Sequence, residues 1–555
     1  MAMQKRIRIG VGALVAWMGL ASLAMAQTPP PVSAPAPKTP AIKAAPPAEG
    51  DQARPRKGAA AAATVASVPR RKTEGGVPFS YDQLIDKAKL LARKPFAPPS
   101  EALPEWLANL DYDGYRDLRY RPEKSLWHEE DLPYQMQFFH RGGLYRQKII
   151  VHEVVGGLAR PVPYLSELFD YGRLSPPSAA PEDLGYAGLR VHGRFLRPDR
   201  LDEVLVFLGA SYFRSLGRGQ HYGKSARGLA IDTALAKGEE FPVFREFWVQ
   251  RPEPGDRRFT VYALLDSASV AGAYRFEVTP GETTVMDVLA RLYTRKPIER
   301  LGIAPLTSMY QFGENQRVGV DDFRPEVHDS DGLELATGAG EWLWRPLNNP
   351  PELRVSSFQD ENPRGFGLMQ RDRDFNNYQD LEAHYDKRPS LWVEPQGAWG
   401  KGSVQLVEIP TDSEIHDNIV AYWVPEKPIS AKAEYNLAYR LYWGNDVPAP
   451  PNLARVEATR IGKGDSPRNM RFILDFAGGA LDNLSAGETP SLSVWSSGGQ
   501  VSPVVVQRNP GLSPQGGWRA FFFFTPPGRE VTELRATLQM GNQPISETWS
   551  YQWSR

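Results

Sequence analysis

The 555-residue sequence contains no cysteine, which excludes disulfides, thiolate nucleophiles and cysteine-bound zinc. Histidine is scarce, with eight residues and no HExxH spacing, and the G-x-S-x-G motif of many serine hydrolases is missing. Lys and Arg number 65, as do Asp and Glu, so the chain lacks the basic excess of proteins that bind nucleic acid or anionic membranes. These absences leave carboxylates as the main candidates for chemistry.

Evidence for a metal or a cofactor is also lacking. The segment HDSDG at 328–332 superficially resembles a calcium-binding loop. Its glycine and the distal glutamate fall at the wrong offsets for such a loop. The sequence therefore predicts no metal and no cofactor.

Long apolar runs are confined to the N-terminus. Lys5, Arg6 and Arg8 precede an apolar run at 9–23, and a small-residue cleavage site ends at Ala26. This order is typical of a secretory signal peptide, here 1–26. The alternative is a membrane anchor, but the run is shorter than the roughly 20 residues that a span needs. We therefore predict an exported protein with no stable membrane insertion after cleavage.

Composition divides the remaining chain. The segment 27–76 is rich in Ala and Pro and poor in large apolar residues, which predicts a disordered spacer. A first domain is expected at 77–444, a linker at 445–452 and a second domain at 453–555. The first domain should begin with a helix at 81–92 that Ser80 caps, because Leu84, Ile85, Ala88 and Leu91 then share one face.

After this helix the pattern predicts an all-β protein. Short stretches that alternate apolar and polar residues recur between Gly and Pro turns, which indicates a large antiparallel β-sandwich. About seven short strands after 453 are typical of a small immunoglobulin-like β-sandwich. The wholly apolar run Phe521–Phe524 should be buried on both faces or covered by the larger domain.

The stretch 310–423 mixes carboxylates with aromatic and amide side chains, which suits a polyhydroxylated ligand. Cleavage of a glycosidic bond uses one carboxylic acid and one carboxylate. Asp417 stands out because it opens DNIVAYW, a strand with Ile419, Ala421 and Trp423 on one side. A carboxyl at the mouth of a strand beside aromatics can stay protonated as a general acid. The alternative is a turn-forming aspartate that bonds its own backbone.

Several long motifs resemble the periplasmic glucan biosynthesis proteins G and D, the osmoregulated periplasmic glucan family. The motifs follow in order from about residue 79 to the C-terminus: FSYDQLIDKAKLLARKPF, LPYQMQFFHRGGLY, GASYFRSLGRGQHYGKSARGLAIDT, FRPEVHDSDGLEL, GEWLWRPLNNP, EAHYDKRPSLWVEP and DNIVAYW. The resemblance implies a large N-terminal sandwich of the galactose mutarotase type and a small immunoglobulin-like one. It also implies a periplasmic protein that acts on the β-1,2-glucan backbone, as an inverting β-1,2-glucanase or as a transglycosylase.

Carried over by motif, Asp417 would be the general acid and Asp329 the general base. Asp331 is the fallback for the base, because two carboxylates two residues apart on a strand share a face. The residues expected to contact glucan are Tyr385, Trp342, Trp344, Trp392, Arg388, His328 and Asp331. Arg214, Gln220 and Tyr222 are further candidates, although turn chemistry explains them equally well.

Three readings remain open. The first is the enzyme just described. The second is a non-catalytic module that binds glucan and receives or shapes it as it is exported, with the inner-membrane glucan glucosyltransferase as a possible partner. The third is a structural envelope protein. The ordinary secretion signal favours the G type over the D type, and the sequence alone leaves hydrolysis and cyclisation unseparated.

Overall fold

The computed structural model describes residues 75–174, 180–197, 200–485, 487–512, 516–528 and 530–554. The predicted signal peptide and nearly all of the predicted spacer lie outside these residues. Within them, no helix is long and apolar enough to cross a membrane.

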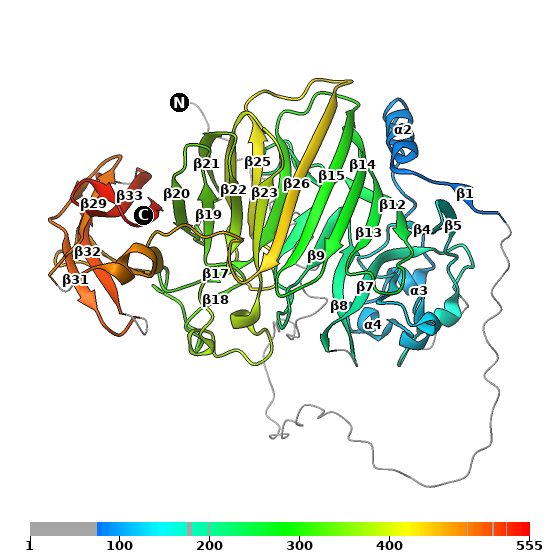
Figure 1. Ribbon diagram of the computed structural model, residues 1–555, viewed down its shortest axis with the longest axis horizontal. Helices are drawn as coiled ribbons and strands as arrows, with labels where there is room; N and C mark the ends of the chain where they lie inside the picture. Colours follow the sequence, from blue (N-terminus) through cyan, green and yellow to red (C-terminus); the bar gives the residue numbers. More distant parts are fainter. Residues whose placement is uncertain are drawn as a thin grey trace, which may run out of the picture.

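Strands dominate the described chain, which confirms the predicted all-β class (Figure 1). The first large sheet has the strand order β1 (Val77–Pro78), β5 (Leu158–Pro161), β4 (Ile150–Val155), β12 (Val243–Gln250), β13 (Phe259–Asp266), β14 (Val270–Thr279), β15 (Thr284–Thr294), β26 (Glu434–Gly444), β23 (Ser390–Pro395), β22 (Gly365–Met369), β19 (Gly332–Ala336), β20 (Trp342–Pro346), β35 (Thr548–Trp553), β33 (Thr532–Met540) and β29 (Ser491–Ser496), with β34 (Gln543–Pro544) beside β33. Most neighbours are antiparallel, and β4–β12 and β20–β35 are parallel.

A second large sheet faces it. Its strand order is β21 (Arg354–Glu361), β24 (Lys401–Glu408), β25 (Ile419–Pro425), β16 (Leu301–Ser308), β10 (Ser225–Arg227), β9 (Tyr212–Ser215), β8 (Arg200–Leu208), β7 (Tyr186–Arg197) and β3 (Tyr134–His140), with β11 (Leu229–Ile231) beside β16. Two short pairs join β17 (Tyr310–Phe312) to β18 (Val327–His328) and β2 (Arg119–Tyr120) to β6 (Phe169–Asp170).

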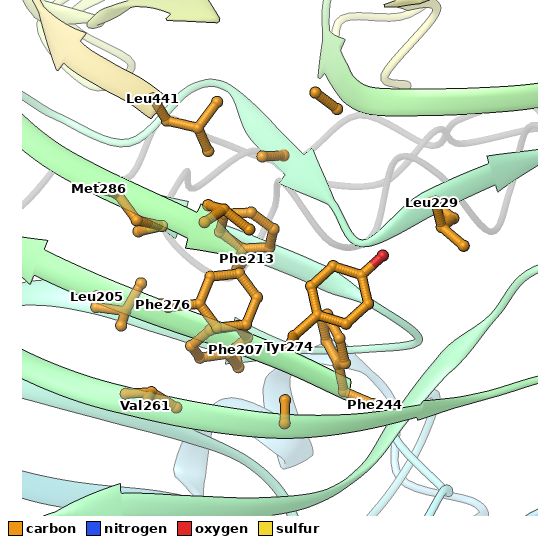
Figure 2. Close-up of a cluster of buried hydrophobic side chains, with 14 of the residues drawn as sticks. Leu205, Phe207, Phe213, Leu229, Phe244, Val261, Tyr274, Phe276, Met286 and Leu441 are labelled. Atoms are coloured by element: carbon orange, nitrogen blue, oxygen red, sulfur yellow. The ribbon is translucent and has the colours of Figure 1, made fainter. Parts of the chain in front are cut away.

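Alternation of apolar side chains builds the core between these two sheets. Phe207 and Phe213 of the second sheet each meet Phe276 of the first, with ring centroids 5.1 Å apart (Figure 2). Ile419, Ala421 and Trp423 of β25 enter the same core, as the sequence predicts. The opposite face of the second sheet carries two smaller apolar clusters, one around Val420 and Tyr422 and one around Val206 and Leu208.

Helices are few and short. They are α2 (Tyr81–Ala92), α3 (Glu105–Ala108) and α4 (Tyr112–Asp117), with 3-10 turns at Pro122–Lys124, His128–Glu130, Ser166–Leu168, Phe375–Asn377, Tyr385–Lys387 and Gly479–Asn483. The prediction for α2 is confirmed: the Ser80 side chain accepts a hydrogen bond from the Gln83 amide, and Leu84 and Ala88 are buried.

The last strands form a smaller two-layered unit, called here the C-terminal sandwich (residues 455–553). Its own sheet joins β27 (Arg455–Lys463), β28 (Met470–Ala477), β32 (Gly517–Thr525), β30 (Gln500–Val501) and β31 (Val505–Asn509). This sheet packs on β29, β33 and β35 through one hydrophobic cluster. Each of the seven strands expected after 453 is present.

The expectation for the run Phe521–Phe524 is wrong. Phe522 and Phe524 are fully buried, whereas Phe521 and Phe523 are only half-buried. The Arg471 guanidinium lies 4.8 Å from the ring centre of Phe523 and 5.9 Å from that of Phe521. An arginine stem thus covers a face for which the sequence suggested a second layer.

Candidate functional site

Three strands of the second sheet meet at one end. Strand β16 ends at Ser308, while its antiparallel neighbours β25 and β10 begin at Ile419 and Ser225. Asp417 comes two residues before β25, and Lys224 comes one residue before β10. Residues that are far apart in the sequence therefore gather at this end of the sheet.

Asp417 is held there through its neighbour Asn418. The Asn418 side chain accepts a hydrogen bond from the Tyr310 amide at 2.8 Å and donates to the Tyr310 carbonyl at 2.9 Å and the Ile409 carbonyl at 3.0 Å. Asp417 itself is 1% exposed. This bonding fixes the start of β25 against the segment that follows β16.

Asp329 reaches the same segment from the other side. Its amide donates to the Met309 carbonyl at 2.9 Å, and the adjacent Ser330 hydroxyl lies 2.7 Å from the Ser308 hydroxyl. Residues 308–310 therefore lie between the chain at Asp329 and the chain at Asp417. The chain segments that carry Asp329 and Asp417 are thus both anchored to the same three residues.

Cations surround Asp329. The Arg388 Nε lies 3.3 Å from the Asp329 Oδ1, and both side chains are buried. A Cβ atom added to Gly223 would come within 2.7 Å of the same Oδ1 and of the Arg388 Cδ, so only glycine fits there without displacing the pair. The Asp329 carboxylate is thus packed from two sides.

Lys224 is fully buried behind this pair. Its ammonium donates hydrogen bonds to the Pro389 carbonyl at 2.6 Å and to the Asp329 carbonyl. Burial lowers the pKa of Lys224 to about 7, although the charge of Asp329 opposes that shift. Lys224 therefore titrates close to neutral pH beside the predicted base.

Asp417 has a different electrostatic neighbour. Burial lowers the pKa of Arg227, but its neighbours Tyr212, Glu239 and Asp417 outweigh that effect, so that the pKa rises. Arg227 also donates from Nη1 to Glu239 at 2.6 Å and from Nε to the Thr307 hydroxyl at 2.9 Å. A buried guanidinium thus accompanies the predicted acid.

Tyr385, predicted to contact glucan, lies beside Arg388, whose guanidinium is 5.3 Å from its ring centre. Its hydroxyl donates to Glu414 at 2.6 Å, and Arg324 donates to the same carboxylate at 2.8 Å. Arg324 also binds Asp380 at 2.8 Å. These contacts tie three loops together around the site.

His328 and Asp331 turn away from Asp329. His328 is fully buried, with its ring nitrogens 2.8 Å from Glu326 and 3.0 Å from Gln370. Burial lowers its pKa, but the bond to Glu326 more than compensates, so the pKa is raised. Asp331 accepts hydrogen bonds from the amides of Arg371 and Asp372 at 2.9 and 3.0 Å.

The idea that Asp329 and Asp331 share a strand face is wrong. Strand β18 ends at His328 and β19 begins at Gly332, so both aspartates lie in the connecting loop. The amide of Asp329 bonds Met309, whereas that of Asp331 bonds Met369. Asp331 lines a separate cavity of about 40 Å³ next to the C-terminal sandwich.

The three predicted tryptophans lie in another environment. Trp344 and Trp392 are buried in the hydrophobic cluster that includes the C-terminal sandwich, and Trp342 packs against it. The rings of Trp342 and Trp392 stack with centroids 5.8 Å apart. Of the further candidates, Arg214 donates to Ser225 and Gln220 donates to Asn445, while Tyr222 is buried.

Sequence reasoning missed Lys224, Arg227 and Arg324. A faint signal was present, since the first two are charged residues within the otherwise small and apolar stretch 223–231. A charge in a buried strand needs a partner, which points to an ion-pair network. The partner of Lys224 at Asp329 is 105 residues away along the chain, whereas Glu239 is only 12 residues from Arg227.

Comparison with known proteins adds a family to this geometry. The family model described as "Periplasmic glucan biosynthesis protein, MdoG" matches residues 79–553. That range includes both large sheets apart from β1, and the C-terminal sandwich.

Individual relatives agree with this match. The chain is 50% identical to a glucans biosynthesis protein G of Rhodopseudomonas palustris over 468 residues, 84% of this chain and 92% of that protein. It is 48% identical to the protein of that name from Bradyrhizobium diazoefficiens over 504 residues, covering 90% and 98%. A relative of that name from Vibrio cholerae is 48% identical over 480 residues, covering 86% and 87%.

Proposed function

Because the chain belongs to the periplasmic glucan biosynthesis protein G family, we propose that it processes the β-1,2-glucan backbone in the periplasm, as an inverting glucanase or a transglycosylase. Asp417 serves as general acid and Asp329 as general base. No metal or cofactor takes part in this scheme.

One observation carries the proposal. Two buried carboxylates from distant parts of the sequence flank the same three residues, 308–310, at one end of the second sheet. Cleavage with inversion needs two carboxyl groups on opposite sides of the scissile bond. Asp329 is preferred to Asp331 because the Asp329 amide bonds Met309, within these three residues, whereas the Asp331 amide bonds Met369.

The chemistry follows from this pair. Asp417 donates a proton to the glycosidic oxygen as the bond between that oxygen and the anomeric carbon breaks. A water molecule attacks the anomeric carbon from the opposite side, and Asp329 accepts its proton, directly or through a sugar hydroxyl. In transglycosylation, a hydroxyl group of glucan replaces the water.

The residues around the two carboxylates have distinct tasks in this scheme. Arg388 and Lys224 hold the Asp329 segment, and Gly223 leaves the space that its carboxylate occupies. Tyr385 lies beside Arg388 and its hydroxyl donates to Glu414; the residue is 3% exposed, so its ring contacts a sugar only when the surrounding loops move apart.

A second function, glucan binding without turnover, is favoured by the burial of the site. Asp417 is 1% exposed and Asp329 is 4% exposed, so a sugar reaches them only when the surrounding loops move apart. A protein that shapes nascent glucan needs the surrounding surface but no access to the carboxylates. The two functions differ in whether glycosidic linkages of the glucan are broken.

The test follows product size and new reducing ends after incubation of the mature protein with linear β-1,2-glucan. The expected result is shorter chains with new reducing ends, at least 100-fold slower for Asp417→Asn and for Asp329→Asn. Asp86→Asn, at an exposed position of α2, is the matched control. Products without reducing ends indicate cyclisation by transglycosylation. Glucan that is bound but unchanged by every variant rules out the enzyme in favour of the binding module.

A further inference from the structure

A groove lies away from the two carboxylates, near the opposite edge of the second sheet. Its volume is about 810 Å³, and its walls come from α4, the segment 119–123, β3 and β7. A second cavity of about 330 Å³ shares Leu144, Tyr145 and Leu208 with it. The two neighbouring cavities are together called here the arginine–tyrosine groove.

Its lining joins aromatic rings to hydrogen-bond donors. Tyr115 and Tyr145 lie with ring centroids 5.0 Å apart, and the Arg116 guanidinium is 5.6 Å from the ring centre of Tyr112. Arg119 and Arg121 follow along the same wall. Aromatic faces with several donors are the features that bind sugar rings and their hydroxyls.

The donors have spare capacity. Arg119 uses Nε for the Arg116 carbonyl, and Arg121 uses Nε for the Phe169 carbonyl. None of Arg116, Arg119 and Arg121 forms an ion pair with a residue that the structure describes. Their remaining N–H groups are therefore available to a neutral, hydroxyl-rich ligand without breaking a salt bridge.

A row of side chains connects the groove to the candidate site. Cross-strand pairing and hydrogen bonds align, in order, Gln137, Arg190, Val206, Arg214, Ser225, Thr307 and Val420. Arg190 lines the groove, and Thr307 binds the Arg227 that accompanies Asp417. The row crosses from β7 to β16 in four strand spacings, or about 20 Å.

We propose that the arginine–tyrosine groove is a second glucan-binding site, which holds a distal part of the strand whose reacting linkage lies between Asp417 and Asp329. This inference rests on the proposed function. A polymer can occupy both sites at once. Once one site is bound, the second binding event is intramolecular, so long chains bind more tightly than short ones. A short oligosaccharide reaches one of them only.

The experiment compares ligand lengths in a background without turnover. The parent protein carries Asp417→Asn, and the triple variant adds Tyr112→Ala, Arg116→Ala and Arg119→Ala. Each is titrated calorimetrically with linear β-1,2-glucan and with a β-1,2-linked tetrasaccharide, which is expected to bind at the candidate site only. We expect at least 10-fold weaker binding of the polymer to the triple variant and less than a 2-fold change for the tetrasaccharide. The latter also reports that the candidate site is still folded.

Trp495→Ala with Arg468→Ala, both at exposed positions of the C-terminal sandwich, removes an aromatic ring and an arginine elsewhere and is expected to change neither affinity. Unchanged polymer affinity in the triple variant overturns the groove proposal alone. An equal loss for both ligand lengths, with the melting temperature preserved, also overturns it, because the groove would then be part of the candidate site. Failure of the parent to bind either ligand removes the proposed function itself.

Discussion

Among single residues, Lys224 makes the clearest pH-dependent contribution. Its pKa in the folded protein is about 7, below the ordinary 10.5, because burial disfavours the ammonium. Between these values the unfolded chain binds more protons than the folded one, so stability rises with pH. At lower pH the folded protein also binds this proton and keeps a buried ammonium, so this increase in stability is absent.

We therefore predict that Lys224 adds a slope of up to about 1.4 kcal/mol per pH unit to the free energy of unfolding between pH 7 and 9. Lys224→Met should remove this slope, measured as the melting temperature of parent and variant across that range. Lys237→Met is the control, since that lysine lies at the surface beside Asp232 and Glu299 and stays protonated in both states. Parallel pH profiles for the parent and Lys224→Met would contradict the prediction.

The contrast between Asp329 and Asp331 shows what sequence could tell about single residues. The motif resemblance singled out Asp417 and Asp329, and in the structure the chain segments that carry them are anchored to residues 309 and 310. The resemblance could not separate Asp329 from Asp331, because the two are anchored by different segments, at Met309 and Met369. These are backbone bonds to carbonyls 20 and 38 residues away in opposite directions along the chain, which leave no local pattern in the sequence.

Among the strands, β25 owes its position to Asn418. This buried side chain bonds both backbone groups of Tyr310 and the Ile409 carbonyl, and so joins the start of β25 to β17. A buried backbone group that loses its partner costs about 1–3 kcal/mol. Three such groups depend on one asparagine.

We predict that Asn418→Ala lowers the free energy of unfolding by about 3 kcal/mol or more and lowers glucan turnover, because Asp417 is the adjacent residue. Thermal denaturation and the reducing-end assay measure the two effects. Asn436→Ala, at an exposed position of β26, should leave both near the parent values. A variant with parental stability and reduced turnover would mean that Asn418 acts on the reaction and not on the strand.

At the level of strands, the alternation of apolar and polar residues correctly predicted which segments form strands. The stretch DNIVAYW became β25 with the expected face in the core, and the helix at 81–92 was found with its cap. The prediction for Phe521–Phe524 was wrong because an apolar side chain is covered equally well by a second layer or by a long arginine. Trp344 and Trp392 illustrate the same ambiguity, since aromatic residues serve cores as readily as sugars.

Across the whole molecule, the C-terminal sandwich is joined to the larger sandwich close to the candidate site. Strand β20 pairs with β35 in parallel, and Arg371 makes two hydrogen bonds to Glu547, at 2.6 and 2.9 Å. The Arg371 guanidinium lies 3.6 Å from the ring centre of Trp344, and its backbone amide binds Asp331. One arginine thus links the C-terminal sandwich to the loop that carries the predicted base.

Glu547→Gln should therefore weaken both the junction and the site. Removing one partner of a buried ion pair costs about 3–5 kcal/mol, and we expect the lower end because Glu334 remains 3.2 Å from Arg371. Hydrogen exchange of the β27 and β35 amides should accelerate by about 100-fold, with glucan turnover reduced as the loop at 329–331 loosens. Glu530→Gln, at an exposed position of the C-terminal sandwich, is the control. Faster exchange with unchanged turnover would mean that the C-terminal sandwich supports the fold alone, whereas loss of both means that it also holds the predicted base in position.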